Sequence, residues 1–214
     1  MLKCGECKIY ACYKGEIEKA PKFCPMKTSK DVFALAKSLY EGDTEIKKLV
    51  INAARVESEG YNKWTRVQET VEFAKKCGFK RIGVAFCIGL RKEAEILVNL
   101  LKTSGFEVFS VVCKTGSLPK EEVGITASEK VRPEEYEVIC NPIAQAMLLN
   151  NAQTDFNIIF GLCVGHDTLF IKFSKAPVTC LVVKDRVLAH NPIGAIYTAH
   201  SYYREKLFGD KQSF

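Results

Sequence analysis

The sequence predicts an α/β protein with a mostly parallel sheet of about five strands, Rossmann-like or flavodoxin-like, with helices on both faces. The main observation is that from Lys80 onward short apolar runs alternate with helical stretches, as in βαβ units. Ahead of this region lie a cysteine-rich segment with little periodicity and three helical stretches. We therefore expect a metal-binding segment over residues 1–28 and an α/β domain over 29–214, divided into a helical lead-in (29–79) and a βα core (80–214).

The residues at the predicted helix boundaries support the helical lead-in. Predicted helices follow Ser29 and Asp43 and start again near Asn62, and they end at Gly42, Gly60 and Gly78. Small polar residues at helix starts and glycines at helix ends are typical boundaries.

The strands of the core are predicted from apolar runs that are rich in β-branched and aromatic residues. Helices are expected between them and at the C-terminal end, where Asn191-Pro192 would begin the final helix. The five runs are RIGVAFC (81–87), EVFSVVC (107–113), YEVIC (136–140), FNIIFGLC (156–163) and PVTCLVV (177–183).

Composition and charge narrow the class of protein. The chain has 214 residues, of which 47% are hydrophobic and 26% charged, as in a soluble globular protein. No apolar run approaches the roughly 18 residues of a membrane span, and the N-terminus lacks the apolar stretch of a signal peptide. The net charge of +6 is scattered beside Glu along helical stretches, which does not indicate nucleic-acid binding. We expect a cytoplasmic protein without nucleic-acid or membrane partners.

The first cysteine group predicts a metal site. Cys4, Cys7, Cys12 and Cys24 have the spacing C-x2-C-x4-C-x11-C. Two thiolates at i and i+3 can hold one ion or one cluster, and four sulfurs suit tetrahedral zinc or an iron–sulfur cluster. A reducing cytoplasm disfavours disulfides here. The spacing leaves zinc and iron–sulfur open.

The second cysteine group lies at predicted strand ends. Parallel strands bring these ends to one edge of the sheet, where open α/β folds bind ligands. A thiol before a helix N-terminus has a lowered pKa, and Arg91 and Lys92 could add positive charge near the first of these cysteines. We expect a second cofactor site there, formed by two or more of its cysteines and completed by His166 or left open for substrate. The candidate residues are Cys87, Cys113, Cys140, Cys163 and His166.

The remaining cysteines and histidines receive weaker assignments. Cys77, at a helix end, and Cys180, inside an apolar strand, are expected to be small buried hydrophobic residues. His190 is a less favoured site candidate than His166, and His200 is expected to be structural.

Long strings identify a resemblance to a family. FCIGLRKEAE, CNPIAQAMLLN, GLCVGHDTLFIKFSKAPVT and VVKDRVLAHNPIGA, together with the N-terminal CGEC…C…CP group, resemble the uncharacterised, cysteine-rich metal-binding proteins of anaerobic bacteria and archaea, a domain of unknown function. The resemblance covers nearly the full chain. It implies metal binding and an anaerobic cytoplasm, and it assigns no reaction.

These observations lead to one main functional hypothesis and two alternatives. The main one is a metalloprotein, with an iron–sulfur cluster (4Fe–4S) and/or zinc, that serves electron transfer or redox chemistry on a small substrate and acts with a redox or metal-transfer partner. The alternatives are a zinc module or cluster carrier without catalysis, and a thiol enzyme that uses Cys140 or Cys163. The sequence leaves open whether the two cysteine groups form two sites, share one, or meet across a homodimer.

Overall fold

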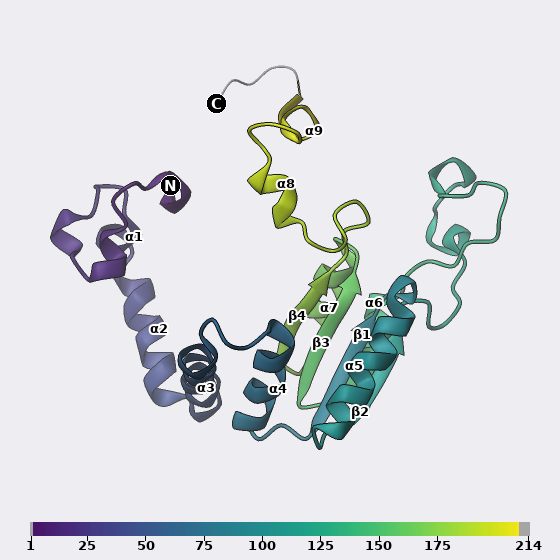
Figure 1. Ribbon diagram of the computed structural model, residues 1–214, viewed down its shortest axis with the longest axis horizontal. Helices are drawn as coiled ribbons and strands as arrows, with labels where there is room; N and C mark the ends of the chain where they lie inside the picture. Colours follow the sequence, from purple (N-terminus) through teal and green to yellow (C-terminus); the bar gives the residue numbers. More distant parts are fainter. Residues whose placement is uncertain (1, 210–214) are drawn as a thin grey trace. The chain divides into compact units, whose positions relative to one another are not determined.

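A computed structural model describes residues 2–209 and divides the chain into two compact units, Met1–Tyr61 and Asn62–Phe214. The boundary falls inside the predicted helical lead-in. Each unit is described by itself (Figure 1).

The first unit consists of short helical turns followed by a helical hairpin. The turns surround the N-terminal cysteines, and the two longer helices begin after Ser29 and Asp43, as the sequence predicts. Asp43 caps the second of them, because its Oδ1 accepts the backbone N–H groups of Glu45 and Ile46 at 2.8 and 3.0 Å. The elements are η1 (Cys4–Glu6), η2 (Ala11–Lys14), η3 (Ile17–Lys19), α1 (Pro25–Thr28), α2 (Lys30–Gly42) and α3 (Thr44–Gly60).

The second unit contains a four-stranded sheet in which every pair is parallel, in the order β2-β1-β3-β4. The strands are β1 (Arg81–Phe86), β2 (Glu107–Val112), β3 (Phe156–Leu162) and β4 (Val178–Val183), and the helices are α4 (Arg66–Lys76), α5 (Arg91–Thr103), α6 (Pro142–Asn151), α7 (His166–Phe173), α8 (Ile193–Tyr197) and α9 (Arg204–Phe208). Short turns η4 (Ile88–Leu90), η5 (Lys120–Val123) and η6 (Ala127–Glu129) complete it.

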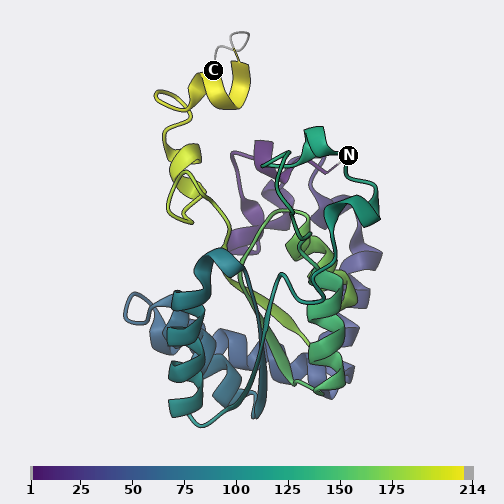
Figure 2. The same ribbon diagram turned by 90° about the vertical axis from the view of Figure 1, so that its right-hand side faces the viewer.

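Helices cover both faces of this sheet, as predicted (Figure 2). On one face, Ile82, Val84 and Ile158 pack with residues of α4 and α5 such as Ala74 and Leu97. On the other face, Ala85 and Ile159 pack with Ala146, Leu149 and Phe170 of α6 and α7. This alternation along β1 and β3 explains why both strands are continuously apolar: each is buried on both sides.

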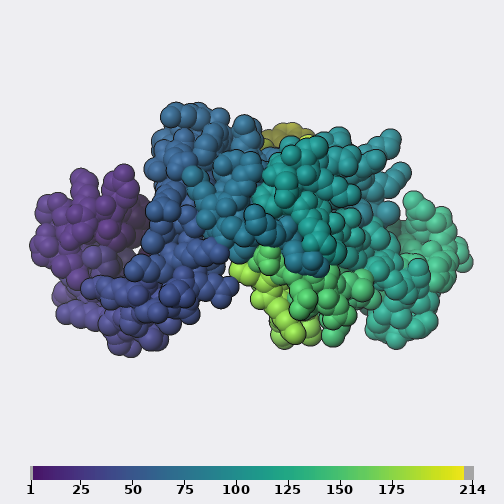
Figure 3. Space-filling view, turned by 90° about the horizontal axis from the view of Figure 1, so that it is seen from below, coloured from purple at the N-terminus to yellow at the C-terminus, as the bar shows by residue number. Residues whose placement is uncertain are grey.

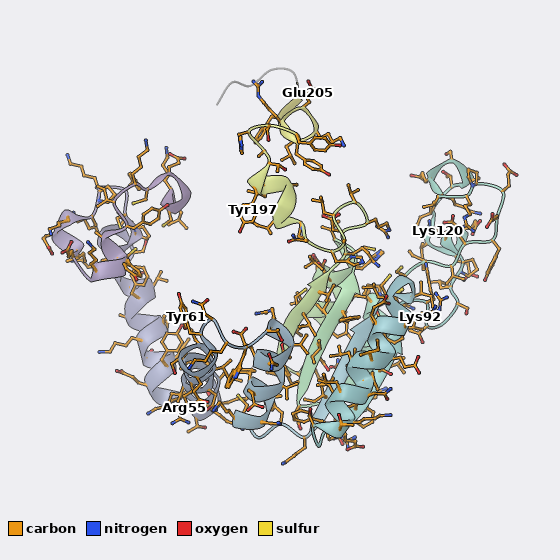
Figure 4. All side chains as sticks on the ribbon, viewed as in Figure 1. Arg55, Tyr61, Lys92, Lys120, Tyr197 and Glu205 are labelled. Atoms are coloured by element: carbon orange, nitrogen blue, oxygen red, sulfur yellow. The ribbon has the colours of Figure 1, made fainter. Side chains whose placement is uncertain are left out.

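The prediction of five strands is wrong, because residues 136–140 do not form one. Ile139 N–H donates to Leu118 O at 2.9 Å and Lys120 N–H to Glu137 O at 3.0 Å, which leaves only an isolated antiparallel bridge between Pro119 and Val138. The backbone of this segment is therefore paired with the polar stretch before it and does not join the parallel sheet. Figure 4 labels Lys120 on this excursion, residues 114–139.

The predicted final helix is also interrupted. Within residues 191–208 the structure has two short helices, α8 and α9, separated by turns. No helix within residues 2–209 is long and apolar enough to cross a membrane.

Candidate functional site

The order of the strands creates a natural ligand site between β1 and β3. The connection from β1 to β2 passes through α5 on one face, and the connection from β3 to β4 passes through α7 on the other. The carboxyl ends of β1 and β3, which are paired in the sheet, are therefore the point where the chain direction reverses, and open α/β sheets bind ligands there. Figure 3 views the opposite, amino-terminal edge.

Three of the four predicted strand-end cysteines meet at this edge. The Sγ atoms of Cys113 and Cys140 lie 3.7 Å apart, and the side chains of Cys87 and Cys113 are hydrogen-bonded to each other. The backbone N–H of Ile88 donates to Cys113 Sγ at 3.4 Å. We call Cys87, Cys113 and Cys140 the sulfur trio.

The backbone places Cys87 and Cys113 side by side. Cys87 directly follows β1, and its N–H donates to Phe160 O at 3.1 Å; Cys113 directly follows β2, and its N–H donates to Phe86 O at 2.8 Å. The ladders of the sheet thus continue one residue beyond the strands. Both thiols are buried.

Cys140 reaches the trio from a loop, because the strand predicted to end there does not form. Asn141 N–H donates to Cys113 O at 2.7 Å, and Asn141 Oδ1 caps α6 by accepting Ala144 N–H at 3.0 Å. Pro142 at the first position of the helix is the predicted start signal. The fully buried Gln145 then donates from Nε2 to Val111 O at 2.7 Å and to Phe86 O at 3.3 Å. These bonds fix α6 against the ends of both strands.

The trio favours thiolates at its two ends. The pKa of Cys87 is lowered to about 5, and the main cause is its hydrogen bond with Cys113. Burial opposes this effect, whereas hydrogen bonds from Gly89 N–H and Lys184 add to it. The hydrogen bond with Cys113, then that with His166 and the charge of Lys114, lower the pKa of Cys140 to about 4 against the effect of burial. The pKa of Cys113 is raised, because its hydrogen bonds with Cys140 and Cys87 favour its protonated form and because it is buried. The middle sulfur therefore keeps its proton.

The predicted site residue His166 lies in contact with Cys140. It is the first residue of α7, and its hydrogen bond with Cys140 raises its pKa. An imidazolium beside a thiolate is thereby stabilised.

Cys163 lies apart from the trio's hydrogen bonds. Its Sγ accepts a hydrogen bond from Arg186 Nη2 at 3.1 Å, and no bond joins it to Cys87, Cys113 or Cys140 in the described part of the chain. The register of β3 against β4 shifts around Phe160 and Leu162, with Gly161 at φ +71°. This irregularity at the end of β3 immediately precedes Cys163.

Several site residues were not selected from the sequence. The positive charge that acts on Cys87 comes from Lys184, whereas the sequence suggested Arg91 and Lys92. Lys184 directly follows β4, Arg186 lies two residues further along, and Lys114 directly follows Cys113. Residues that follow parallel strands share one edge of the sheet. This rule identified the cysteines, and it would also have identified these cations.

The N-terminal cysteines form a second cluster, within the first unit. They line one cavity of about 30 Å³, together with Tyr10, Ala11 and Phe23 among others. Cys7 N–H donates to Cys4 O at 3.1 Å, and Tyr10 N–H donates to Cys7 Sγ at 3.4 Å. The residues that line the cavity are Cys4, Cys7, Tyr10, Ala11, Cys12, Pro21, Phe23, Cys24 and Pro25.

The side chains are not arranged around an ion. None of the ten cysteines forms a disulfide. Within residues 2–209, no group of three or more His, Cys, Asp or Glu side chains is placed to hold a metal ion as the side chains stand.

The other cysteines and His190 lie elsewhere in the second unit. Cys77 is fully buried, as predicted. Cys180 is partly buried, and burial is the main cause that raises its pKa. His190 Nδ1 accepts the backbone N–H of Asp185 at 3.1 Å.

Fold and site together define an open parallel α/β protein with a thiol cluster at the carboxyl edge of its sheet. The chain belongs to the family of proteins of unknown function DUF1847, whose model matches residues 24–181. It is also 44% identical over 210 residues to an uncharacterized protein of Methanocaldococcus jannaschii, and the match covers 98% of this chain and 100% of that protein. No solved structure matches. The predicted membership in a family of unknown function is confirmed, and an archaeon provides one relative.

Proposed function

We propose that this protein binds a metal centre through Cys87, Cys113, Cys140 and His166 and uses it for redox chemistry. The contact chain that joins the three sulfurs at the carboxyl edge of the sheet is the observation that supports this proposal most directly. Three thiols and an imidazole are donors suited to zinc or to an iron–sulfur cluster. Small side-chain rotations would be needed to direct them at one centre.

The surrounding charges fit a bound thiolate centre. Lys184 is hydrogen-bonded to Cys87, and both His166 and the charge of Lys114 act on Cys140. Metal binding requires deprotonated cysteines, and these cations reduce the cost of removing their protons. The Ile88 N–H bond to Cys113 Sγ belongs to the contacts that orient and tune metal-bound sulfur.

Each residue has a distinct task in this proposal. Cys87 and Cys140 are the thiolates at either end, and Cys113 loses its proton when the centre binds. His166 orients Cys140 and is the fourth donor. An iron–sulfur cluster in this position would supply one-electron transfer, which implies a redox partner protein or a small substrate at the open edge.

The N-terminal cluster is proposed as a second metal site. Four thiols around one cavity of about 30 Å³ match the ligand set of a structural zinc ion. The segment 2–24 contributes only Ala11 and Ala20 to the buried apolar residues, so bound metal would supply stability that its own core cannot.

A thiol enzyme is the second candidate function. It is favoured by the contact between His166 and the partly exposed Cys140, an arrangement of base and nucleophile known from thiol catalysis. This candidate predicts one fast-reacting cysteine and no metal at the sheet edge.

Metal and acid-labile sulfide analysis, with a visible spectrum, on protein purified without oxygen tests the proposal. We expect iron and sulfide, or zinc, bound at the sheet edge, and we expect Cys140→Ser and Cys113→Ser to remove most of it. Cys180→Ser is the matched control, because Cys180 lies in the same unit outside the trio. If these variants keep the full metal content, or if wild-type protein binds metal only at the N-terminal cluster, the sheet-edge metal centre is refuted.

A further inference from the structure

A second concave site lies beside β4 on the face of the sheet that α5 covers. It has a volume of about 430 Å³, which falls in the range of small-molecule sites. Its apolar lining includes Leu90, Phe160 and Val182, which pack in the cluster on this face. Its polar side chains are Glu93 and His190. We call this space the β4 pocket.

The loop after β4 presents His190 in a fixed state. Asp185 Oδ1 accepts the N–H groups of Val187 and Leu188 at 2.9 and 2.8 Å, and His190 N–H donates to Asp185 O at 2.9 Å. Ala189 and His190 both have positive φ, 49° and 64°, an uncommon backbone conformation that costs energy and concentrates at functional sites.

This loop also sets the tautomer of the imidazole. Because Nδ1 accepts the Asp185 N–H, the proton of the neutral ring lies on Nε2. Nε2–H has no acceptor within residues 2–209, so it is available to a ligand.

Glu93 supplies the complementary group. It lies in the first turn of α5, and its carboxylate has no hydrogen bond or ion pair in the described part of the chain. The pocket thus combines one hydrogen-bond donor and one acceptor with apolar walls that include an aromatic ring.

We propose that the β4 pocket binds the base of a purine nucleotide. The Watson–Crick edge of a purine presents an amino or ring N–H donor next to a ring nitrogen or carbonyl acceptor; Glu93 accepts from the former and His190 Nε2–H donates to the latter. Pyrimidines share this pattern, but the two fused rings of a purine offer more apolar area to the pocket walls, which favours the purine. Leu90, Val182 and the ring of Phe160 contact the apolar faces of the base.

The position of the pocket also accounts for a phosphate. Leu90 follows β1 by four residues, so the pocket borders the chain-reversal point where nucleotides bind in open α/β sheets. Lys184 Nζ lies 3.4 Å from the place that a Cβ on Gly89 would occupy, one residue from the pocket wall at Leu90. Its ammonium is a cation on this side of the pocket for a phosphate group. The inference does not depend on metal at the sulfur trio.

Isothermal titration calorimetry of the full-length protein with AMP, GMP, adenosine and UMP tests the inference. We expect AMP or GMP to bind at least tenfold more tightly than UMP, and we expect His190→Asn and Glu93→Gln each to weaken that binding at least tenfold. Asn tolerates positive φ, so the first variant preserves the loop. Glu95→Gln, on an exposed turn of the same helix, is the control and should bind like wild type.

Tighter binding of AMP than of adenosine assigns the phosphate to the site, and equal binding restricts the inference to the nucleoside. No heat with any purine at millimolar concentration, or unchanged affinity in both variants, overturns it. Metal content is measured separately, so failure here is distinguishable from failure of the metal centre.

Discussion

The sulfur atoms of Cys113 and Cys140 lie 3.7 Å apart although the two residues are 27 positions apart in the chain. Cys113 ends the extension of β2, and Cys140 immediately precedes the Asn141 cap of α6. The backbone bond from Asn141 N–H to Cys113 O holds the two residues together. This pairing is the geometric centre of the proposed site.

The first prediction concerns oxidation of the metal-free protein. Treatment with a diazene oxidant such as diamide should link Cys113 and Cys140 first, because their sulfurs are already in van der Waals contact at 3.7 Å and only a small movement brings them to the roughly 2 Å of a disulfide bond. The oxidant takes up two electrons and the two thiol protons. Peptide mapping under non-reducing conditions measures the product. A first disulfide that involves Cys180 or Cys77 would contradict this geometry.

The second prediction concerns the pH dependence of alkylation. The thiolate is the reactive form, and the pKa of Cys140 is lowered to about 4. In metal-free protein its reaction with iodoacetamide should be nearly independent of pH between about 6 and 8 and should fall as pH drops toward about 4. Cys180, whose pKa is raised chiefly by burial, should react appreciably only in alkaline solution.

Substitution of His166 checks the cause of this shift. The hydrogen bond of His166 is one of the contacts that lower the pKa of Cys140, so His166→Gln should move the fall in rate to higher pH. A wild-type rate for Cys140 that still rises steeply between pH 8 and 9 would show an ordinary thiol.

The third prediction concerns Gly83, on the face of β1 covered by α6. A Cβ there would lie 2.0 Å from Asn157 Oδ1 and 2.8 Å from Leu149 Cδ1. Asn157 cannot move freely, since its Oδ1 accepts from Thr154 Oγ1 and its Nδ2 donates to Ser174 Oγ, both at 2.8 Å. Gly83→Ala should lower the free energy of unfolding by about 3 kcal/mol, through overpacking and a broken buried hydrogen bond.

Gly194→Ala is the control for this experiment. A Cβ at Gly194 meets its nearest neighbour, Leu188 Cδ1, at 3.7 Å, an ordinary contact. Urea unfolding should give a change within about 0.5 kcal/mol of wild type. An equal effect of the two substitutions would refute the packing described for Gly83.

The fourth prediction concerns the N-terminal cluster. If Cys4, Cys7, Cys12 and Cys24 hold metal, a strong chelator or the substitution Cys24→Ser should make residues 1–28 more sensitive to trypsin at their lysines. With Cys24→Ser, the βα core should be cleaved at an unchanged rate, because its sheet is buried by the helices of its own unit. Limited proteolysis followed by mass spectrometry measures both rates, and equal protection with and without chelator would contradict a structural metal.

The sequence predicted most of the fold, because hydrophobic periodicity and helix caps are local signals. Four of the five predicted strands and the helices around Asp43 and Asn141 are present. The run YEVIC has the composition of a strand, but a strand also needs a neighbour with matching backbone groups. Leu118 and Lys120 occupy those groups instead, and such pairing cannot be read from composition.

The site was partly predictable for a related reason. Cys87 and Cys113 follow strands of a parallel sheet, so their meeting follows from topology alone. Cys140 meets them through the Asn141 bond and the cap of α6, and the strand assigned to it does not exist. Cys163 has the same local signal, yet it is paired with Arg186, which depends on the irregular end of β3. The direction of the strands alone does not predict that shift in register.

The separation of Cys113 and Cys140 along the chain has a thermodynamic consequence. Any ligand or bond that joins both sulfurs closes a ring around the intervening excursion and restricts the unfolded chain. For a ring of this length the loop-closure contribution is about 3.5 kcal/mol. Binding of a ligand or formation of a bond at the sulfur trio would therefore be coupled to the folding of the excursion, residues 114–139. Loss of that bridge would increase the conformational entropy of this segment, away from the sulfurs themselves.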